Sequence, residues 1–462
     1  MKPSEVNRIP WTIPLPPSAG PAVAVIQRLA TAGYEAFLVG GAVRDLLLGL
    51  PVGDFDVATA APPETLARLF PQTEPVGAAF GVMIVVQNGT AVETATYRAE
   101  ACYSDSRHPD KVTLSSSLAE DARRRDFTVN ALYLDPLAEQ LSDPVGGMAD
   151  CAQRVLRTVG DASERFREDA LRLLRAPRLA AQCGLSIHAD TRAALAQHKE
   201  RIRQVSAERV GKEISLSLTG PDPAAALALL AEVGLLAIIL PEVAAMQGVP
   251  QPPEFHPEGD VWTHTLLMLS LSQNRSLPLG LGILLHDVGK PATIIHADRI
   301  RFNGHTKAGV QITLSIGRRL RLPTKAINRT ATLVEQHMRF LDVQRMRPAT
   351  LKRFLRQPHF DDLLELHRLD CVASHGNLTN YEFSRRILAD LKDEDLRPAP
   401  LLRGRDLIAL GYAAGPQLGR ILRQLETAQL EGTMRTRADA ESWLQRAHPL
   451  PPSPPAPKSD GT

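Results

Sequence analysis

Two aspartates, Asp54 and Asp56, give the strongest sign of chemistry in this sequence of 462 residues. Side chains two residues apart on a strand point to the same face, so these two would present carboxylates side by side, which suits Mg²⁺. Such ions can activate an attacking hydroxyl group and stabilise a leaving pyrophosphate. Glu93, in the run AVETATYR, is the candidate third carboxylate from a neighbouring strand. The three residues predict a magnesium-dependent catalytic centre.

A glycine-rich turn precedes these carboxylates by about ten residues, close enough for one strand-turn-strand unit to hold both around a triphosphate. Gly40 and Gly41 let the backbone approach a phosphate, the following helix N-terminus offers free N–H groups, and Arg44 adds a full charge. A Gly-Gly pair alone is more often a plain turn, and an Asp-x-Asp alone is more often a solvated strand end. Together, in this order, they favour a nucleotide-binding site.

A second candidate is a charged stripe in the run RFREDALRLLRAPR. Its members stand three residues apart on a predicted helix: Asp169, Arg172, Arg175 and Arg178, with Glu168 just before them. From spacing alone, a solvated helix face with ion pairs is the favoured interpretation. The alternative is that an arginine fork and a carboxylate match the Watson–Crick edge of C or A, which would select a base without a template. Pro177 inside the stripe predicts a kink.

A third candidate is a set of histidines and aspartates in the second half of the chain. Imidazoles and carboxylates gathered from several helices suit a divalent transition metal in a bundle core. The candidates are His264, the adjacent pair His286-Asp287, His305, His337 and Asp370. A single buried histidine is more often structural than a metal ligand, and that is the interpretation given to His256, His296, His367 and His375.

An α+β head followed by helices must position these residues. The head is predicted to contain a helix over residues 22–32 and strands over 36–39, 82–86 and 91–96. Later segments show helical apolar spacing, with long runs over 162–183, 223–240 and 351–369. The run QPPEFHPEG over 251–259 interrupts them with three prolines and predicts a boundary or a functional loop. The predicted domains are a disordered Pro-rich extension (1–20), the head (21–153), a helical neck (154–220), a helical metal-binding domain (221–395), a helical tail (396–448) and a disordered Pro-rich end (449–462).

Composition excludes several classes of protein. Lys and Arg number 53 against 51 Asp and Glu, so attraction to nucleic acid must come from local clusters. The four cysteines form no CxxC pair, which argues against a zinc ribbon or a disulfide framework and fits a reducing cytosol. Neither a membrane span nor a signal peptide is indicated. We expect a cytoplasmic protein without a membrane partner.

The segment FLVGGAVRDLLLGLPVGDFDVAT resembles the first motif of class II CCA-adding enzymes and bacterial poly(A) polymerases, within the polymerase-β-like nucleotidyltransferases. RRRDFTVNAL resembles the second motif of that family, which implies that Arg125 and Asp126 hold the nucleotide, with Asn130 nearby. DPVGGMADC resembles the hinge between head and neck. The resemblance also implies that Asp169 and Arg172 read the base and that the later arginines of the stripe contact phosphates.

Three further segments resemble parts of such enzymes. YRAEACYSDSRHPD, residues 97–110, resembles the loop that complete CCA-adding enzymes need to switch from C to A. GILLHDVGKP resembles the HD phosphohydrolase superfamily, which implies that His264, His286, Asp287 and Asp370 bind metal. The segment over 401–446 resembles a tail that grips the tRNA elbow by shape and backbone charge.

The resemblance implies template-independent addition of CCA to tRNA from CTP and ATP. Phosphoester hydrolysis at RNA ends in the HD-type domain is a possible second activity. Two alternatives remain open at this point: a poly(A) polymerase, and a metal-dependent phosphohydrolase whose head only binds RNA. The sequence also leaves open whether C and A addition are divided with a second enzyme, which metal the HD-type domain binds, and the oligomeric state.

Overall fold

The computed structural model describes residues 7–77, 81–99, 114–115, 117–273 and 275–450. The chain divides into two compact units: the first comprises residues 1–253 and 258–331, and the second comprises 254–257 and 332–462. Most of the predicted loop over 97–110, and the Pro-rich end from residue 451, lie outside the described residues. Within the described part of the chain, no helix is long and apolar enough to cross a membrane.

The head of the first unit is built on an eight-stranded mixed sheet in the order β1-β8-β7-β2-β3-β6-β5-β4. Its strands are β1 (Asn7–Pro10), β2 (Ala36–Val39), β3 (Asp56–Thr59), β4 (Thr73–Gly77), β5 (Val82–Gln87), β6 (Thr90–Thr96), β7 (Tyr133–Asp135) and β8 (Gln140–Asp143). The three strands predicted from sequence are confirmed as β2, β5 and β6 to within one residue. At the centre of the sheet, β3 pairs antiparallel with β2 and parallel with β6.

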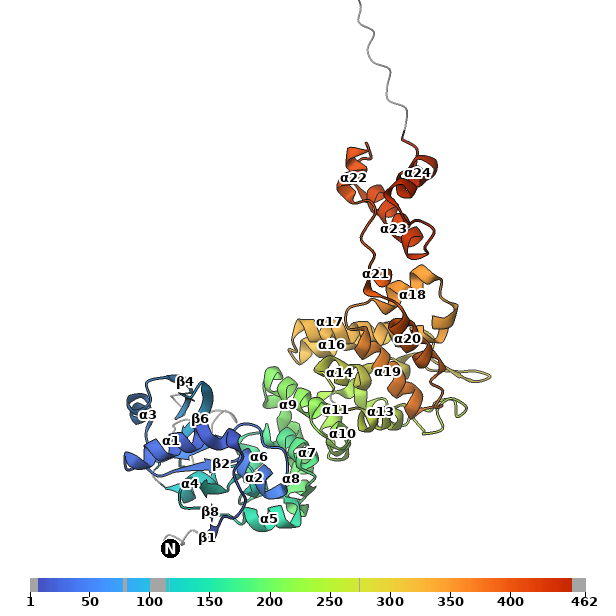
Figure 1. The fold of residues 1–462 in the computed structure, drawn as a ribbon. Helices are drawn as coiled ribbons and strands as arrows, with labels where there is room; N and C mark the ends of the chain where they lie inside the picture. Colours follow the sequence, from blue (N-terminus) through green and yellow to red (C-terminus); the bar gives the residue numbers. More distant parts are fainter. Residues whose placement is uncertain (1–6, 78–80, 100–113, 116, 274, 451–462) are drawn as a thin grey trace, which may run out of the picture. The chain divides into compact units, whose positions relative to one another are not determined.

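Helices cover this sheet (Figure 1). They are η1 (Pro17–Ala19), α1 (Gly20–Thr31), α2 (Gly41–Leu48), α3 (Pro63–Leu69), α4 (Leu118–Arg123), η3 (Thr128–Asn130) and α5 (Gly147–Gln153). The predicted helix over 22–32 is α1, whose Val25 and Leu29 are fully buried. A mixed sheet covered by helices confirms the predicted α+β class of the head.

The prediction that residues 1–20 stay outside the fold is wrong from residue 7 onward. Strand β1 pairs antiparallel with β8, and the N–H group of Trp11 donates to the Glu139 carbonyl at 2.8 Å. Because β1 is an edge strand, Pro10 is tolerated there although it lacks a backbone donor. The indole of Trp11 adds the apolar burial that the composition of the segment did not suggest.

The neck contains a break where one helix over 162–183 was predicted, so that prediction is wrong. Helix α6 (Ala162–Glu168) ends before Asp169, and α7 (Arg172–Cys183) begins three residues later. The Asp169 carboxylate accepts from the N–H group of Leu171 at 3.0 Å, which stabilises a local turn over continued helix. Helix α7 does continue through Pro177. The predicted runs over 223–240 and 351–369 are likewise each divided, by left-handed residues at Gly234 and His359.

The segment that resembles a hinge packs tightly against the head. The Asp143 carboxylate accepts from the N–H groups of Gly146, Gly147 and Met148 at 2.8 to 3.0 Å, which anchors the start of α5. A Cβ atom at Gly147 would lie 2.2 Å from the carbonyl oxygen of Thr128, so only glycine permits this approach of α5 to η3.

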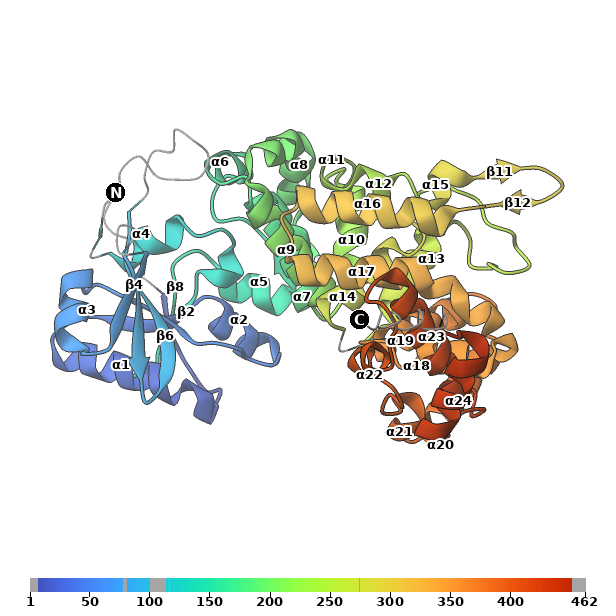
Figure 2. The same ribbon diagram turned by 90° about the horizontal axis from the view of Figure 1, so that it is seen from above.

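The remaining elements of the first unit are mostly helical. They are β9 (Val155–Leu156), β10 (Ser186–Ile187), α8 (Ala189–His198), η4 (Lys199–Gln204), α9 (Ala207–Thr219), α10 (Pro223–Glu232), α11 (Leu236–Ile239), α12 (Pro241–Ala244), α13 (Val261–Leu271), α14 (Leu277–Leu285), α15 (Lys290–Thr293), β11 (Ile295–His296), β12 (Ile300–Arg301), α16 (His305–Arg319) and the first part of α17 (Thr324–Gln336). Helices α16 and α17 lie side by side (Figure 2), where Gly317 faces Ile327.

The second unit is helical in its described residues. After the end of α17 it contains η5 (His337–Arg345), α18 (Pro348–Leu355), α19 (Phe360–Ala373), α20 (Thr379–Asp390), α21 (Asp393–Leu396), α22 (Gly404–Ala409), α23 (Pro416–Leu430) and α24 (Arg437–Ala447). The last three helices share an apolar core around Leu407, Ile421 and Leu444. The Pro-rich run over 251–259, predicted to be a boundary or a functional loop, is where the two units exchange residues 254–257.

Candidate functional site

Three carboxylates gather at one edge of the central strands. Asp56 is the first residue of β3, whereas Asp54 lies in the segment just before it, so the prediction that both stand within a strand is corrected for Asp54. Val57 of β3 pairs with Thr94 of β6 in a parallel ladder. Asp56 directly precedes Val57, and Glu93 directly precedes Thr94. The structure therefore brings Glu93 next to Asp56, as the sequence predicted.

Charge and burial disturb the ionisation of Asp56. Burial, followed by the negative charge of Glu93, raises the pKa of Asp56 to about 6, although Arg125 acts in the opposite direction. Such a clustering of carboxylates is unfavourable by itself, and a bound divalent cation would relieve it. The all-oxygen donor set fits a hard cation, so these residues fit the metal that the sequence predicts.

Cation affinity at this centre is expected to fall by about tenfold between about pH 7 and about pH 5, since one proton must be displaced below the raised pKa of Asp56. Above that pKa the carboxyl group is already ionised, so the affinity should level off. Calorimetric titration with Mg²⁺ would measure this in a protein that lacks the second metal cluster through His286→Ala and Asp287→Ala. Equal affinities at the two pH values would contradict the assignment of Asp56.

Carboxylates and arginines together line a small cavity of about 180 Å³. Asp56 and Glu93 line it together with Arg98, Arg124 and Arg125. A cavity lined by both carboxylates and guanidinium groups suits a metal-bound triphosphate, because the cation binds the carboxylates and the phosphates bind the arginines. The three arginines are called the arginine wall below. Arg125 was predicted from sequence, whereas Arg98 and Arg124 were not.

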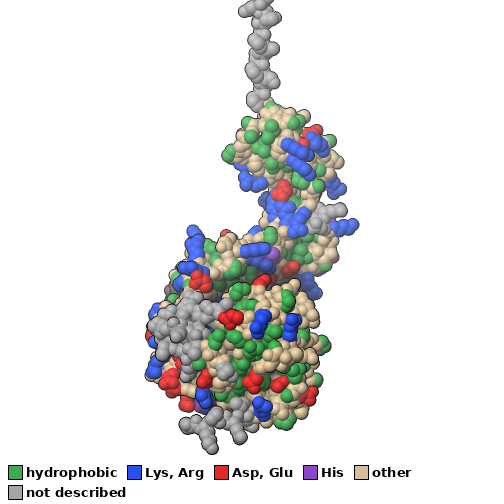
Figure 3. Space-filling view, turned by 90° about the vertical axis from the view of Figure 1, so that its left-hand side faces the viewer, with side chains coloured by type: hydrophobic (Ala, Val, Ile, Leu, Met, Phe, Trp, Pro, Cys, Tyr) green, Lys and Arg blue, Asp and Glu red, His purple; other side chains and the backbone are tan. Residues whose placement is uncertain are grey.

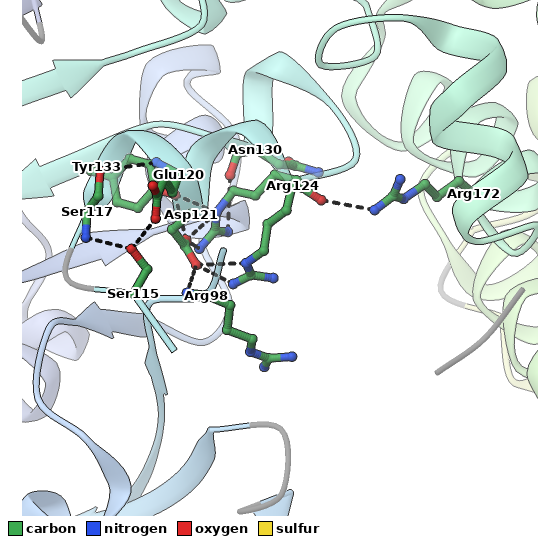
Figure 4. Close-up of polar contacts among 10 residues, drawn as sticks. Arg98, Ser115, Ser117, Glu120, Asp121, Arg124, Asn130, Tyr133 and Arg172 are labelled. Atoms are coloured by element: carbon green, nitrogen blue, oxygen red, sulfur yellow. Dashed lines mark hydrogen bonds and ion pairs between the residues drawn. The ribbon is translucent and has the colours of Figure 1, made fainter. Parts of the chain in front are cut away.

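The arginines on this wall share one carboxylate, that of Asp121 (Figure 4). Asp121 forms ion pairs with Arg124 and with Arg125, the latter at 3.1 Å, and it accepts from the backbone N–H group of Arg98 at 3.2 Å. The hydroxyl group of Tyr133 donates to it at 2.6 Å. Sequence reasoning missed Asp121 and Tyr133, whose partners lie up to 23 residues away along the chain.

The glycine turn has the predicted geometry, but Arg44 is held by protein groups. Gly40 adopts φ 76°, which favours glycine, and α2 starts at Gly41. Arg44 is buried, pairs with Asp45 at 2.7 Å and donates to the Asn130 side-chain oxygen at 2.6 Å. The turn therefore offers backbone N–H groups to a phosphate, while Arg44 links the turn to the second motif.

The predicted base-reading stripe is divided between different partners. Arg172 pairs with Glu168 at 2.7 Å and donates to the Arg124 carbonyl oxygen at 3.0 Å. Asp169 pairs with Arg209 instead, and Arg178 pairs with Glu213. These interactions bring Arg172 to the head beside Arg124, as Figure 4 shows, but they do not pair Asp169 with Arg172.

Arg175 ties the neck to the second motif of the head. It forms an ion pair with Asp126 at 2.6 Å. Burial alone would raise the pKa of Asp126, but Arg175 and Arg172 hold it well below its usual range. Asp126 also accepts from the Asn130 amide at 3.1 Å, so it stays ionised and joins the two parts of the unit.

A second cluster lies between α13 and α14 of the first unit. Metal-ligating atoms of His264, His286 and Asp287 lie within 4.8 Å of one another, and all three residues are buried. The Nδ1 atom of His286 faces the Ile283 carbonyl oxygen at 2.9 Å, which leaves its Nε2 atom, 3.0 Å from Asp287, on the side of the cluster. This donor set fits a divalent transition metal.

Neighbouring groups orient this cluster, and sequence reasoning missed two of them. Glu258 contacts the Nδ1 atom of His264 at 2.5 Å, in the manner of carboxylates that orient metal-binding histidines. Lys290 pairs with Asp287 at 2.6 Å. The Nε2 atom of His305 lies 3.6 Å from the other oxygen of Asp287, and burial lowers the pKa of His305, which keeps its imidazole neutral.

The remaining candidate ligands, His337 and Asp370, belong to the second unit, at the start of η5 and in α19. They remain predictions. Of the histidines assigned a structural role, His367 is buried and stacks on Phe340 with ring centroids 4.2 Å apart, and burial lowers its pKa to about 4.

Three family models match consecutive parts of the chain. The model described as "Poly A polymerase head domain" matches residues 36–157, the "Probable RNA and SrmB- binding site of polymerase A" matches 184–247, and the HD domain matches 261–364. The first covers both the carboxylates and the arginine wall, and the third contains the histidine cluster. Both metal-dependent modules that the geometry indicates are therefore matched by known families.

Curated relatives and solved structures agree with these matches. The chain is 47% identical over 224 residues to a CCA-adding enzyme of Geobacillus kaustophilus and 44% identical over 211 residues to one of Levilactobacillus brevis. The matches cover 48% and 46% of this chain but 55% and 53% of those proteins, so the chain spans about half the length of the curated relatives it matches.

The structure of the Bacillus stearothermophilus CCA-adding enzyme in complex with CTP is similar over 94% of this chain and 98% of that one, with 29% identity and a TM-score of 0.71. The Thermotoga maritima CCA-adding enzyme complexed with tRNA has 18% identity and a TM-score of 0.60 over 96% of this chain and 100% of that one, which shows a shared fold.

Proposed function

We propose that this chain, which is similar to CCA-adding enzymes and matches the models of a poly A polymerase head and an HD domain, adds CCA to the 3′ end of tRNA from CTP and ATP. The observation that carries the proposal is the small cavity that Asp56 and Glu93 line together with three arginines. We assign catalysis to residues 21–153, the neck to 154–220, the HD-type domain to 221–395 and the tail to 396–448. A substrate of this kind would place the protein in the cytoplasm.

The proposed reaction is attack of the tRNA 3′-hydroxyl group on the α-phosphate of the nucleotide, with pyrophosphate leaving. Asp54, Asp56 and Glu93 would hold Mg²⁺, which supplies charge neutralisation at the attacking and leaving oxygens. Arg125, with Arg98 and Arg124 beside it, binds the triphosphate, and the N–H groups that follow Gly40 and Gly41 contact its phosphates.

Base selection is assigned to the start of the neck. Arg172 already reaches the head through the Arg124 carbonyl. Glu168 places one carboxylate beside it, whereas Arg209 holds the carboxylate of Asp169. A guanidinium group with a neighbouring carboxylate presents both donors and acceptors, as the Watson–Crick edges of C and A require. Exchange of the Asp169–Arg209 ion pair for a contact with the base would complete the site. Arg175 and Arg178 are proposed to lie along the phosphates.

Replacement of Arg172 by alanine is expected to reduce the discrimination between CTP and ATP by roughly 10- to 100-fold, as for the loss of one bidentate base contact. Primer-extension kinetics with each nucleotide in turn would give the ratio of the two kcat/KM values. Arg192→Ala is the matched control, because Arg192 is an arginine of α8 in the same neck that pairs with Glu232 on the surface. An unchanged ratio in Arg172→Ala would refute the assignment.

A second candidate activity rests on the buried cluster of His264, His286 and Asp287. We propose that it holds a divalent transition metal and that it hydrolyses phosphoesters at RNA ends. The head and this cluster belong to different family models, so the two activities should be separable by mutation.

The C-terminal helices are proposed to hold the tRNA. Residues 396–448 contain eight arginines against five acidic residues. Figure 3 shows several blue side chains on the visible face of this part of the second unit. These arginines are exposed, which suits contact with the RNA backbone. A-form RNA presents its phosphate charges to a protein but few base edges that a protein can read.

Separate nucleotides distinguish this proposal from a poly(A) polymerase. A tRNA transcript that lacks its last three nucleotides would be incubated with the protein, Mg²⁺ and either CTP or ATP alone. CTP alone should add two residues and ATP alone should add none. Long A tails from ATP would establish poly(A) synthesis instead, and addition that always stops after CC, even with ATP present, would indicate that C and A addition are divided between two enzymes.

A further inference from the structure

We propose that Asp121 is a positioning residue that fixes the arginine wall of the catalytic cavity in its triphosphate-binding geometry. This inference rests on the proposed function, since it names the group that holds the nucleotide-binding arginines in place. It concerns no contact of Asp121 with substrate: its side chain is 1% exposed, whereas those of Arg124 and Arg125 are 22% and 18% exposed. The three arginines line the cavity, whereas Asp121 is not among the residues that line it.

Each oxygen of this carboxylate serves a different part of the wall. Oδ1 accepts from Arg124 and from the backbone N–H group of Arg98. Oδ2 accepts from Arg125, at 3.1 and 3.2 Å, and from the Tyr133 hydroxyl group at 2.6 Å. One buried group thereby contacts all three arginines that line the cavity, as Figure 4 shows in part.

Tyr133 fixes the orientation of Arg125 from a second side. The Arg125 Nε atom donates to the tyrosine oxygen at 2.9 Å, and the guanidinium carbon lies 5.1 Å from the centre of the ring. Tyr133 is fully buried in β7 of the sheet, so it cannot follow a moving arginine. The pair Asp121–Tyr133 therefore joins the wall to the rigid part of the fold.

The helix that carries Asp121 also gathers the segment on which Arg98 lies. Arg98 pairs with Leu114 in an isolated bridge, and the Ser115 hydroxyl group donates to Glu120 in the first turn of α4 at 2.5 Å. Backbone and side-chain contacts thus bring Arg98 to the helix that also holds Asp121. A single change at Asp121 should therefore loosen three arginines at once.

Charge explains why an acid is needed at this position. Three guanidinium groups around one small cavity repel one another, and one buried carboxylate reduces that repulsion without filling the cavity. Burial would raise the pKa of Asp121, but Arg125, Arg124 and the Tyr133 hydroxyl group lower it to about 2, so the charge persists. The three arginines and Asp121 together keep a net positive charge, which a bound triphosphate would neutralise.

The test is the Asp121→Asn substitution, which keeps the shape and removes the charge. We expect the KM for CTP and for ATP to rise by the same factor, roughly 10- to 100-fold, with kcat changed by less than about threefold. An equal factor is expected because the triphosphate is common to both nucleotides. Tyr133→Phe should give a smaller rise in both KM values, and it remains informative if Asp121→Asn does not fold.

A matched control separates positioning from general stability. Asp150→Asn removes another buried carboxylate, which contacts Thr128 and Arg157 away from the cavity, and it should lower the melting temperature without changing either KM. Calorimetric binding of CTP without tRNA keeps the two proposals distinct. Wild-type protein that binds CTP but extends no tRNA would overturn the proposed function alone. Equal CTP affinities in wild type, Asp121→Asn and Tyr133→Phe would overturn the positioning role.

Discussion

The Asp56→Asn protein is expected to lose nucleotide addition by at least about a thousandfold, because a metal ligand contributes several kcal/mol to stabilisation of the transition state. Its stability should not fall. Burial and the neighbouring Glu93 raise the pKa of Asp56. Ionisation of this carboxyl group at neutral pH therefore lowers the stability of the folded protein. Asparagine keeps the shape and removes this charge, so the melting temperature should stay equal or rise while activity disappears.

The measurement is single-turnover addition of CTP to a tRNA transcript, together with a thermal melt. Asp135→Asn is the matched control, since Asp135 is an aspartate of the same sheet whose carboxylate caps a surface turn. It should lose a little stability and no activity. Normal addition by Asp56→Asn would remove the basis for the catalytic assignment, and a large fall in its melting temperature would show that the loss of activity was structural.

Removal of His286 and Asp287 together is expected to eliminate metal uptake by the second cluster. These two residues supply two of the three buried donors, and protein metal sites depend steeply on their number of ligands. The content of transition metal, measured by elemental mass spectrometry after dialysis, should fall from about one ion per chain to background. Nucleotide addition should be unchanged, because the cluster belongs to a different module from the head.

His296→Ala provides the control for that experiment. His296 lies in β11 of the same unit and is exposed, so its loss should leave the metal content as it is. If the double substitution retained its metal, the cluster would not be the binding site. If it also lost CTP addition while remaining folded, the two activities would not be separable.

The sequence predicted those elements of the fold whose conformation depends on residues close to one another along the chain. The strands β2, β5 and β6 follow from short β-branched runs between Gly and Asn turns, and the glycine turn follows from the conformational freedom of Gly40. The N-terminal strand did not follow, because its partner β8 lies more than one hundred residues away and supplies its hydrogen bonds. The break at Asp169 was missed for a similar reason: Arg209, which holds the Asp169 carboxylate, stands 40 residues further along.

The same distinction separates the site residues that were predicted from those that were not. The spacing of Asp54 and Asp56 identified them in the sequence, and the structure places Glu93 beside Asp56. The roles of Arg98 and Asp121 depend on a hydrogen bond from the Arg98 backbone to the Asp121 carboxylate. The two residues are 23 positions apart, so no short sequence motif contains both. Glu258 stood in a Pro-rich loop recognised as unusual, but its contact with His264 depends on how that loop turns.

The most direct measurement is the sequence of the 3′ ends after a tRNA lacking its CCA end is incubated with the protein, Mg²⁺, CTP and ATP together. The products are expected to end in CCA without further extension, and Asp56→Asn is expected to give no product under the same conditions. Products with other 3′ ends, or an unextended tRNA in the presence of folded wild-type protein, would contradict the proposed function.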